Sequence, residues 1–263
     1  MVVLETKNLS IEFGGLKAVS NFNFAINEGD LVGLIGPNGA GKTTVFNMLS
    51  GIYNPTSGSI LFNTQKSKLV NINKHKPYQT TREGIARTFQ NIRLFKNLTV
   101  MDNVRIALHT SARYNSLQAI LRTPAFYKEE VRIKERAQEL LKIFNLDSKQ
   151  NELAKNLPYG EQRKLEITRA LATDPKLLLL DEPAAGMNPQ ETQNLMQLIK
   201  FIREKFDLTI LLIEHDMSLV MGICERITVL DYGVTLAEGT PEQISKDPKV
   251  IKAYLGEDGG FSA

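Results

Sequence analysis

The sequence predicts an α/β fold in which a parallel β-sheet is interrupted by an inserted helical subdomain. Two uninterrupted apolar runs, LLLL at 177–180 and TILLI at 209–213, are typical of strands that are covered on both faces. An apolar stripe of helical period lies between them and contains Leu195, Leu198, Ile199, Ile202 and Phe206. Because strand and helix alternate along 166–240, we expect a parallel sheet with helices packed on it.

The first part of the chain, residues 1–90, predicts short strands and one helix. The expected strands are FNFAI at 22–26, LVGLI at 31–35 and SILF at 59–62. The polar and basic segment 63–84 is expected to be a solvated loop, with a binding patch as the alternative. Together, 1–90 and 166–240 are expected to form the core of a single domain.

The middle of the chain, residues 91–165, predicts the inserted helical subdomain. Along 133–144 the apolar residues fall on one helix face, and they are Ile133, Ala137, Leu140, Leu141 and Phe144. The last stretch, 241–263, is expected to be a C-terminal helix with a frayed tail.

Composition excludes several classes of protein. The 263 residues are 42% hydrophobic and 23% charged, which is ordinary for a globular chain, and a net charge of +3 is too small to indicate nucleic-acid binding. The single cysteine, Cys224, excludes an internal disulfide. The longest apolar runs fall well short of the roughly 20 residues that a membrane-spanning helix needs, and the N-terminal MVVLETKNLS lacks the basic start of a signal peptide. We expect a soluble chain, or one attached to a membrane only through a partner.

The segment GPNGAGKTT at 36–44 matches the phosphate-binding pattern G-x-x-x-x-G-K-[ST] and lies between an apolar strand and a predicted helix. Glycines allow a tight turn whose N–H groups point inward, and the helix adds the positive end of its dipole. Lys42 is expected to reach the β- and γ-phosphates of a nucleotide, and the Thr43 hydroxyl to bind Mg²⁺. The predicted nucleotide contacts are Gly36, Pro37, Asn38, Gly39, Ala40, Gly41, Lys42, Thr43 and Thr44. The alternative is a chance match, which the strand–loop–helix context disfavours.

Two carboxylates end the buried strand in LLLLDEP at 177–183. Because ligands of α/β sheets lie at the carboxyl ends of strands, Asp181 is expected to hold Mg²⁺, directly or through water. Glu182 is expected to be the general base or the group that orients the attacking water. Side chains alternate along a strand, so the two carboxylates take separate roles. The structural alternative is an acidic turn that follows a core strand.

Two further polar residues follow strands. His215, in LLIEHDM at 211–217, repeats the strand-end position of Asp181 and could contact the γ-phosphate and sense its loss. Gln90, in RTFQN at 87–91, follows a short β-like run and could reach Mg²⁺ or the attacking water. A purely structural His215 is the alternative, and Gln90 alone is a weak signal. His75 and His109 have no comparable setting.

The motifs occur in the order phosphate loop, Gln90, LPYGEQRKLEI, LLLLDEP and His215, and this order resembles the nucleotide-binding domains of ABC transporters over nearly the whole chain. The resemblance implies a P-loop NTPase core of RecA type with an antiparallel β subdomain and an inserted helical subdomain. It also implies ATP and Mg²⁺ as cofactors, ATP hydrolysis, and a head-to-tail dimer. In such a dimer the helix that begins near Gly160 faces the γ-phosphate of ATP held by the other subunit.

The segment before the acid pair departs from the family pattern Leu-Ser-Gly-Gly-Gln. Pro158, Tyr159 and Glu161 replace Ser, the first Gly and Gln. The contact with the ATP of the partner is therefore expected from backbone N–H groups around Gly160, with the Tyr159 hydroxyl as a further donor. Glu161 is expected to turn away from the phosphate toward a cation such as Arg163.

Five segments carry a closer resemblance, to the LivG-type ATP-binding subunits of branched-chain amino-acid importers. These segments are FGGLKAV, RTFQNIRLFKNLTV, LPYGEQR, DEPAAGMNP and GTPEQI. The resemblance implies that Phe13 stacks on adenine, with a core aromatic as the alternative, and that AGMN at 185–188 crosses the dimer interface. Asn188 stands where the family often has Asp, which weakens any role for charge there.

The resemblance also implies partners and a location. The expected partners are a second cassette, identical or related, and membrane permease subunits, with an extracytoplasmic solute-binding protein acting indirectly. The permease is expected to dock on NIRLFKNLTV at 91–100 through Leu94, Phe95 and Leu98, whose alternative role is ordinary core. The chain is then expected at the cytoplasmic face of the cell membrane as a peripheral protein, and nucleic acid is not an expected partner.

Three other functions stay open at this point. The first is an ABC cassette for another cargo, such as lipopolysaccharide export or an unrelated solute, because a cassette does not touch the cargo. The second is a soluble ABC ATPase acting on DNA or ribosomes, which the absence of sustained heptads and of a basic stripe disfavours. The third is a P-loop kinase or switch GTPase, which the arrangement of LPYGEQ and DEP disfavours.

Overall fold

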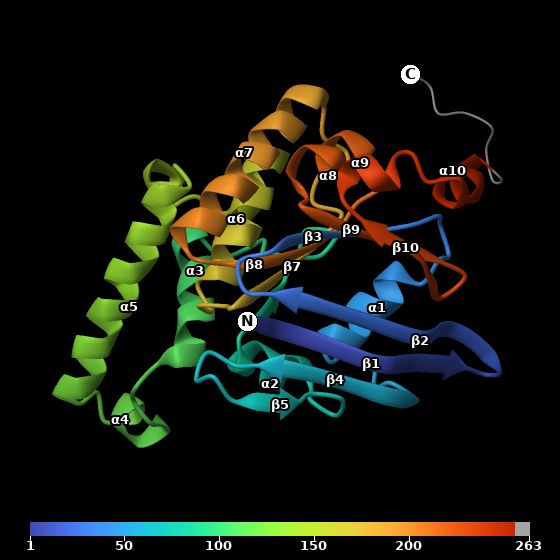
Figure 1. Ribbon diagram of the computed structural model, residues 1–263. Coiled ribbons are helices and arrows are strands. Elements are labelled where there is room, and N and C mark those ends of the chain that lie inside the picture. The colour runs from blue at the N-terminus through green and yellow to red at the C-terminus, as the bar shows by residue number, and fades with distance from the viewer. Residues whose placement is uncertain (256–263) are drawn as a thin grey trace. The chain divides into compact units, whose positions relative to one another are not determined.

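A computed structural model describes residues 1–255, and the expected tail at 256–263 lies outside the described residues. The chain divides into two compact units, Met1–Gln90 with Lys176–Ala263, and Asn91–Pro175. Each unit has its own strands or helices and its own buried residues. The first unit contains both β-sheets, and the second is helical (Figure 1).

Within the described residues, the larger sheet of the first unit has six strands in the order β10-β9-β3-β8-β7-β6. The strands are β3 (Leu31–Ile35), β6 (Ile85–Arg87), β7 (Leu177–Asp181), β8 (Thr209–Ile213), β9 (Arg226–Asp231) and β10 (Val234–Gly239). All neighbours are parallel except β10, which pairs antiparallel with β9. Every residue of β3, β7 and β8 is buried, which is why these strands are uninterrupted apolar runs. The predicted parallel sheet is confirmed.

Helices cover both faces of this sheet. They are α1 (Lys42–Leu49), α2 (Pro77–Glu83), α7 (Pro189–Lys205), α8 (Met217–Ile223), α9 (Pro241–Ile244) and α10 (Pro248–Leu255). Gly33 in β3 faces α8, because a side chain there would meet Val220 and Cys224. Its neighbours Val32 and Leu34 point the other way, into the core that contains α1. Successive residues of β3 therefore point to opposite faces of the sheet, one facing α8 and the other facing α1.

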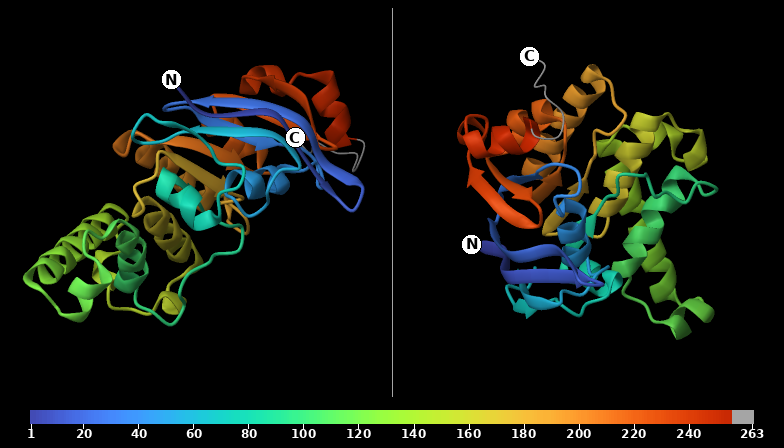
Figure 2. Two further views of the ribbon diagram at one scale, coloured as in Figure 1. Left: turned by 90° about the horizontal axis from the view of Figure 1, so that it is seen from below. Right: turned by 90° about the vertical axis from the view of Figure 1, so that its right-hand side faces the viewer.

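The second sheet of this unit is antiparallel and has the order β2-β1-β4-β5. Its strands are β1 (Val2–Phe13), β2 (Leu16–Asn27), β4 (Ser57–Asn63) and β5 (Leu69–Asn71), which lie side by side in both views of Figure 2. One hydrophobic cluster joins side chains of this sheet to Phe46 and Leu49 of α1 and to Leu179 and Leu211 of the parallel sheet. The α1 helix is thus fixed by packing against both sheets, as expected for a core with an antiparallel β subdomain.

The prediction of a solvated loop at 63–84 is wrong, because part of the segment forms β5 and α2. Helix α2 has Pro77 at its first turn, and Gln79 accepts a hydrogen bond from the backbone N–H of Lys76. Thr80 is its only buried residue. Without an apolar stripe the helix could not be recognised by periodicity.

The second unit contains α3 (Val100–Leu108), α4 (Ser116–Ile120), α5 (Pro124–Ile143), α6 (Tyr159–Leu171) and three short 3₁₀ helices, His109–Ser111, Asp147–Lys149 and Ala154–Asn156. The predicted stripe Ile133, Ala137, Leu140, Leu141 and Phe144 is buried. The expected boundary at 165 lies inside α6, whereas the unit ends at Pro175. Helix α6 continues to Leu171, so a boundary at 165 would divide this helix.

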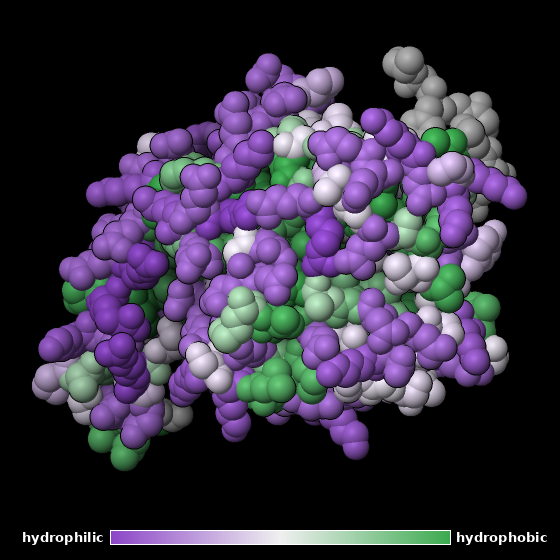
Figure 3. All heavy atoms as spheres, in the orientation of Figure 1, coloured by the Kyte–Doolittle hydropathy of each residue, from purple (hydrophilic) through white to green (hydrophobic). Residues whose placement is uncertain are grey.

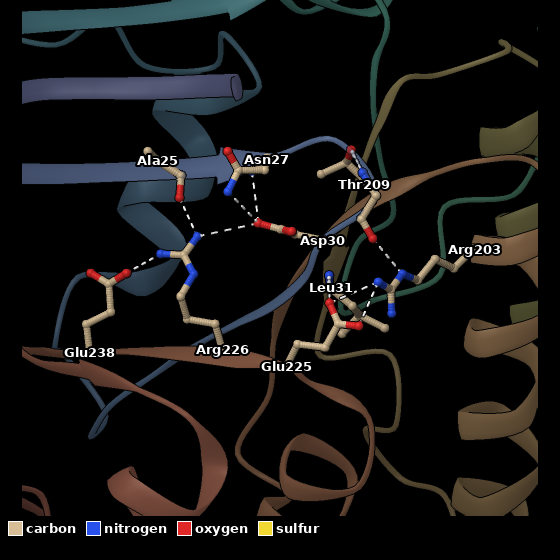
Figure 4. Close-up of polar contacts among 10 residues, drawn as sticks. Ala25, Asn27, Asp30, Leu31, Arg203, Thr209, Glu225, Arg226 and Glu238 are labelled. Carbon is tan, nitrogen blue, oxygen red and sulfur yellow. Dashed lines mark hydrogen bonds and ion pairs between the residues drawn. The ribbon is translucent and has the colours of Figure 1, made fainter. Parts of the chain in front are cut away.

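Charged residues tie together the starting ends of β3 and β9 (Figure 4). Glu225 accepts two hydrogen bonds from Arg203, of 2.8 and 2.9 Å, and one from the backbone N–H of Leu31. Arg226 pairs with Glu238 and lies 3.9 Å from Asp30. These contacts lie at the edge opposite to the carboxyl ends of the strands, so we assign them a stabilising role.

No helix among residues 1–255 is long and apolar enough to cross a membrane. Hydrophilic residues cover most of the face drawn in Figure 3, with hydrophobic ones scattered between them, as on ordinary water-exposed surfaces.

Candidate active site

The predicted phosphate loop connects the end of β3 to the start of α1. Gly41 is the residue before the helix and has a left-handed backbone, with φ of 101°. The ammonium group of Lys42 donates hydrogen bonds to the carbonyls of Gly36 and Pro37, at 2.6 and 2.8 Å, and the side chain is buried. Lys42 therefore lies over its own loop, next to the N–H groups at the helix start.

Gly36 and Gly41 are required by the packing of this loop. Gly36 has a φ of 148°, and a Cβ there would lie 2.0 Å from the carbonyl oxygen of Leu230 in β9. At Gly41 a Cβ would lie 2.7 Å from the carbonyl oxygen of Ala18 in β2. The loop is held against two different strands at distances that only glycine permits.

A pocket of about 370 Å³ opens at this loop. It is lined by Leu16, Lys17, Ala18, Asn38, Gly39, Ala40, Gly41, Lys42, Thr43, Thr44, Glu182 and Tyr232. The structure thus brings residues 38–44 of the predicted loop and Glu182 to one cavity, whereas Gly36 and Pro37 are not among its lining residues. Sequence reasoning missed the lining from β2 and from the β9–β10 turn, where Tyr232 is 82% exposed. Only the tertiary fold brings these residues to the loop.

Glu182 is the centre of a cluster of polar side chains. Its Oε2 accepts a 2.6 Å hydrogen bond from Gln90, and Nδ1 of His215 lies 3.7 Å from the same oxygen. Glu182 has a left-handed backbone, with φ of 44°, which is strained for a residue with a side chain. Such strain concentrates at functional sites. The three residues predicted as catalytic therefore meet at one carboxylate.

Asp181 lies beside this cluster but has a partner that the sequence reasoning missed. Arg87 of β6 donates a 2.6 Å hydrogen bond to Oδ2 of Asp181, and both side chains are buried. The same guanidinium group donates hydrogen bonds to the side chain of Asn47 in α1 and to the hydroxyl of Ser50, the residue that follows α1. A buried guanidinium needs such partners. Arg87 therefore links the end of β7 to the helix that follows the phosphate loop.

Glu214 is a second residue that sequence reasoning missed. It is 1% exposed and follows β8 directly, before His215. Its carboxylate accepts hydrogen bonds from the backbone N–H groups of Ala184, His215 and Asp216. Burial raises the pKa of Glu214, and these hydrogen bonds oppose the rise. The strand-end argument used for Asp181 applies equally to Glu214 and could have found it.

Phe13 is not among the residues that line the pocket. Its ring is 45% exposed and packs edge-on against Tyr53, with centroids 5.3 Å apart. The core alternative for Phe13 is therefore excluded, because a core aromatic would be buried. A role in stacking on adenine stays a prediction.

Asn188, in the loop expected at the dimer interface, caps α7. Its side chain accepts a 2.9 Å hydrogen bond from the N–H of Glu191, and Glu191 accepts one from the N–H of Asn188. Asn and Asp are equally good at this position of a helix. The capping role therefore explains why a neutral residue serves here.

In the second unit, α6 begins at Tyr159, directly after Pro158. Glu161 turns toward a cation, but this cation is Lys149 at 2.6 Å and not Arg163. Arg163 instead forms a buried ion pair with Glu166, and its guanidinium also lies 3.3 Å from the Tyr159 hydroxyl. The charge of Glu161 at the helix start is thus compensated within this unit.

The segment expected to dock on a permease also lies in this unit. Phe95 and Leu98 are 48% and 38% exposed, and Leu94 is partly buried. The side chain of Asn103 holds the backbone of Phe95 through hydrogen bonds to its N–H and its carbonyl oxygen. Core packing is therefore excluded for Phe95 and Leu98, which a fixed backbone presents at the surface.

Comparisons with known proteins agree with this geometry. Residues 19–185 match the family model described as ABC transporter, and residues 234–260 match the one described as branched-chain amino acid ATP-binding cassette transporter. The chain is 48% identical to two high-affinity branched-chain amino acid transport ATP-binding proteins, BraF of Pseudomonas aeruginosa and LivG of Escherichia coli K12, over 97% of this chain and 98% of each relative. It is 34% identical to the lipopolysaccharide export system ATP-binding protein LptB of E. coli K12, over 98% of this chain and 99% of LptB.

Among solved structures, the ADP conformation of MJ1267, an ATP-binding cassette of an ABC transporter, has a TM-score of 0.82 and 31% identity, over 97% of this chain and 99% of MJ1267. These comparisons confirm the cassette fold and the resemblance to LivG-type subunits that the motifs predict.

Proposed function

The chain belongs to the ABC transporter family, and we propose that it is the ATP-hydrolysing subunit of an importer for branched-chain amino acids. The observation that carries the enzymatic part is the pocket that Lys42 and Thr43 share with Glu182, because it combines a phosphate cradle with a carboxylate. Greater identity to BraF and LivG than to LptB favours amino-acid import over lipopolysaccharide export. The match at 234–260 to the branched-chain amino acid family model supports the same choice.

The phosphate loop would bind the nucleotide through its N–H groups, with the start of α1 adding the positive end of the helix dipole. Lys42 would exchange its bonds to loop carbonyls for bonds to the β- and γ-phosphates. Thr43 lines the pocket and Asp181 ends the strand that leads to Glu182, and a hydroxyl and a carboxylate are oxygen donors that fit Mg²⁺. When bound, Mg²⁺ would neutralise charge on the phosphate oxygens.

Hydrolysis would use the cluster around Glu182. The carboxylate would orient a water and accept its proton as the water attacks the γ-phosphate, while the bond from the γ-phosphorus to the bridging oxygen breaks and ADP leaves. The Gln90 amide holds the carboxylate at 2.6 Å, so a change at Gln90 would be passed to the base. His215 lies within 3.7 Å of the same oxygen and would contact the γ-phosphate.

The proposed machine is a two-site dimer in which each ATP lies between the phosphate loop of one cassette and the start of α6 of another. The N–H groups of the first turn of α6 would donate to the γ-phosphate, as helix starts do for anions. Lys149 compensates the charge of Glu161, which removes the main electrostatic objection to phosphate there. ATP would then favour the closed dimer and hydrolysis would favour its opening, because both halves bind the intact nucleotide.

The other proposed partners are permease subunits in the membrane, with a solute-binding protein acting through them. The chain would lie at the cytoplasmic face of the membrane as a peripheral subunit. The exposed Phe95 and Leu98 support a docking role, since partners bury exposed aromatic and aliphatic side chains. Gln90 directly precedes this segment in the chain, which would connect the permease to the cluster around Glu182.

Replacing Phe95 with Asp is expected to release the chain from membranes without weakening ATP binding. A central aromatic contact is worth about 2 kcal/mol or more, so association should fall at least about tenfold. The local fold should persist, because Asn103 holds the backbone of Phe95 and not its ring. Co-sedimentation with native membranes measures membrane association, and nucleotide titration of the purified chain measures ATP binding.

Val131→Asp is the matched control, because Val131 is 55% exposed on α5 of the same unit. It should leave membrane association unchanged. Normal association of a folded Phe95→Asp variant would remove the docking proposal.

Purification of the tagged chain from native membranes in mild detergent tests the transport function. Mass spectrometry should identify two polytopic permease subunits and a second cassette, and the assembled complex should take up leucine, isoleucine and valine. Co-purification with lipopolysaccharide export proteins would indicate that the complex transports lipopolysaccharide and not amino acids. A ribosome or a DNA-repair complex without a permease would leave the ATP chemistry intact and exclude transport.

A further inference from the structure

Glu214 has a carboxyl group that the proposed chemistry does not use. Its side chain is fully buried, and Nδ1 of His215 lies 3.9 Å from its Oε2. Burial of a carboxylate costs free energy unless it is compensated by hydrogen bonds. An apolar side chain at this position would leave three backbone N–H groups, those of Ala184, His215 and Asp216, without their acceptor. The role of the carboxylate therefore depends on which segments these N–H groups belong to.

The hydrogen bonds of Glu214 join two loops. Oε1 accepts a 2.7 Å hydrogen bond from the N–H of Ala184, two residues after Glu182. Oε2 accepts hydrogen bonds from the N–H groups of His215 and Asp216, at 3.1 and 3.4 Å. One carboxylate thus binds the loop after β7 with one oxygen and the loop after β8 with the other.

These two loops carry the groups that meet at the predicted active site. Glu182 begins the first loop in a strained backbone conformation, with φ of 44°, and its N–H is held by the carbonyl of Ile213 in β8. His215 lies in the second loop, and its Nδ1 is 3.7 Å from Oε2 of Glu182. Glu214 therefore connects the backbone of the loop that contains Glu182 to the backbone of the loop that contains His215. In the proposed mechanism, the distance between these two side chains matters for hydrolysis.

We propose that Glu214 is a positioning residue that fixes Glu182 and His215 relative to each other through the backbones of Ala184 and His215. The inference rests on the roles proposed above for Glu182 and His215. Two acceptor oxygens are required, because the two loops approach from different sides. A glutamine has one acceptor oxygen and an amino group, so one loop would face a donor in place of its acceptor.

Glu214→Gln in the full-length chain, purified with its membrane partners, tests this role. We expect kcat for ATP to fall about 10- to 100-fold, since small misplacements of catalytic groups have effects of this size. We expect KM for ATP to stay within about twofold, because the phosphate loop supplies most of the predicted nucleotide contacts and follows β3, whereas the hydrogen bonds of Glu214 go to the loops after β7 and β8. A merely structural role would lower thermal stability without separating kcat from KM in this way.

Glu225→Gln is the matched control. Glu225 also accepts a hydrogen bond from a backbone N–H, that of Leu31, but at the opposite edge of the sheet. It should retain the wild-type kcat. If the melting temperature shows that Glu214→Gln is not folded, Glu214→Asp replaces it, because Asp keeps both oxygens but withdraws them by one methylene, and the same separation of kcat from KM is expected.

Two results would overturn the positioning role, namely a kcat within about twofold of wild type or a KM that rises as kcat falls. A Glu182→Gln variant assayed in parallel separates this inference from the proposed function. If Glu182→Gln is inactive while Glu214→Gln is normal, only the role of Glu214 is wrong. If Glu182→Gln turns over at the wild-type rate, the proposed role of Glu182 fails, and the inference about Glu214 fails with it.

Discussion

Replacing Glu182 with Gln is expected to stop ATP turnover while ATP binding persists. Gln has nearly the same shape, so the pocket and the contact with Gln90 should change little. An amide cannot accept the proton of the attacking water, and general base catalysis contributes about 10²- to 10⁴-fold to such reactions. Lys42 and the loop N–H groups, which would bind the phosphates, are untouched by the substitution.

The measurement is steady-state phosphate release from the purified complex, together with the affinity for ATP by fluorescent-nucleotide displacement. Because the nucleotide bridges two cassettes in the proposed mechanism, the variant should also accumulate as an ATP-bound dimer, visible by light scattering. Glu225→Gln is the control for loss of a carboxylate, since Glu225 lies at the opposite edge of the sheet. Wild-type phosphate release by Glu182→Gln would show that another group serves as the base.

The parts of the fold that could be predicted are those in which burial leaves a local pattern. The bounds of β3 and β8 match the predicted strands because every residue in them is buried, so the apolar runs start and stop with the strands. Helix α2 left no such pattern, because Thr80 is its only buried residue. The order of the strands, β10-β9-β3-β8-β7-β6, could not be read from any local pattern.

The residues of the candidate site also fall into two groups, those that a local sequence pattern predicts and those that only the fold brings together. Residues of the phosphate loop could be predicted because one contiguous motif contains them, and Glu182 could be predicted because it directly follows a buried apolar strand. Arg87 and Lys149 were missed, because their partners Asp181 and Glu161 lie far away in the sequence and only the fold brings them together. Glu161 turns toward a cation as expected, but this cation is Lys149 and not the suggested Arg163, because Arg163 is paired with Glu166.

Replacing Gly36 with Ala is expected to weaken ATP binding about 100-fold or more and to lower thermal stability. The new Cβ would lie 2.0 Å from the carbonyl oxygen of Leu230, so the loop must move away from β9. This carbonyl belongs to β9, which pairs with β3 as far as Val229 and with β10 at Leu230 and Asp231, so it cannot yield easily. A shift of about 1 Å in a binding group can cost about 100-fold. The Gly36 carbonyl also accepts a hydrogen bond from Lys42, so the shift would displace the phosphate-binding ammonium group as well.

Gly39→Ala separates the clash from the cost of the backbone conformation. Gly39 also has a left-handed φ, of 80°, but no heavy atom of the described chain, apart from its chain neighbours, lies within 4 Å of a Cβ placed there. Both variants should lose the roughly 1–2 kcal/mol that a left-handed conformation costs a residue with a side chain. Only Gly36→Ala should lose further stability and ATP affinity because of the clash with Leu230. Thermal melting of both variants compares their stabilities, and nucleotide titration compares their affinities for ATP. Equal affinities in the two variants would mean that the loop accommodates a methyl group beside β9, and that the position of Lys42 does not depend on this contact.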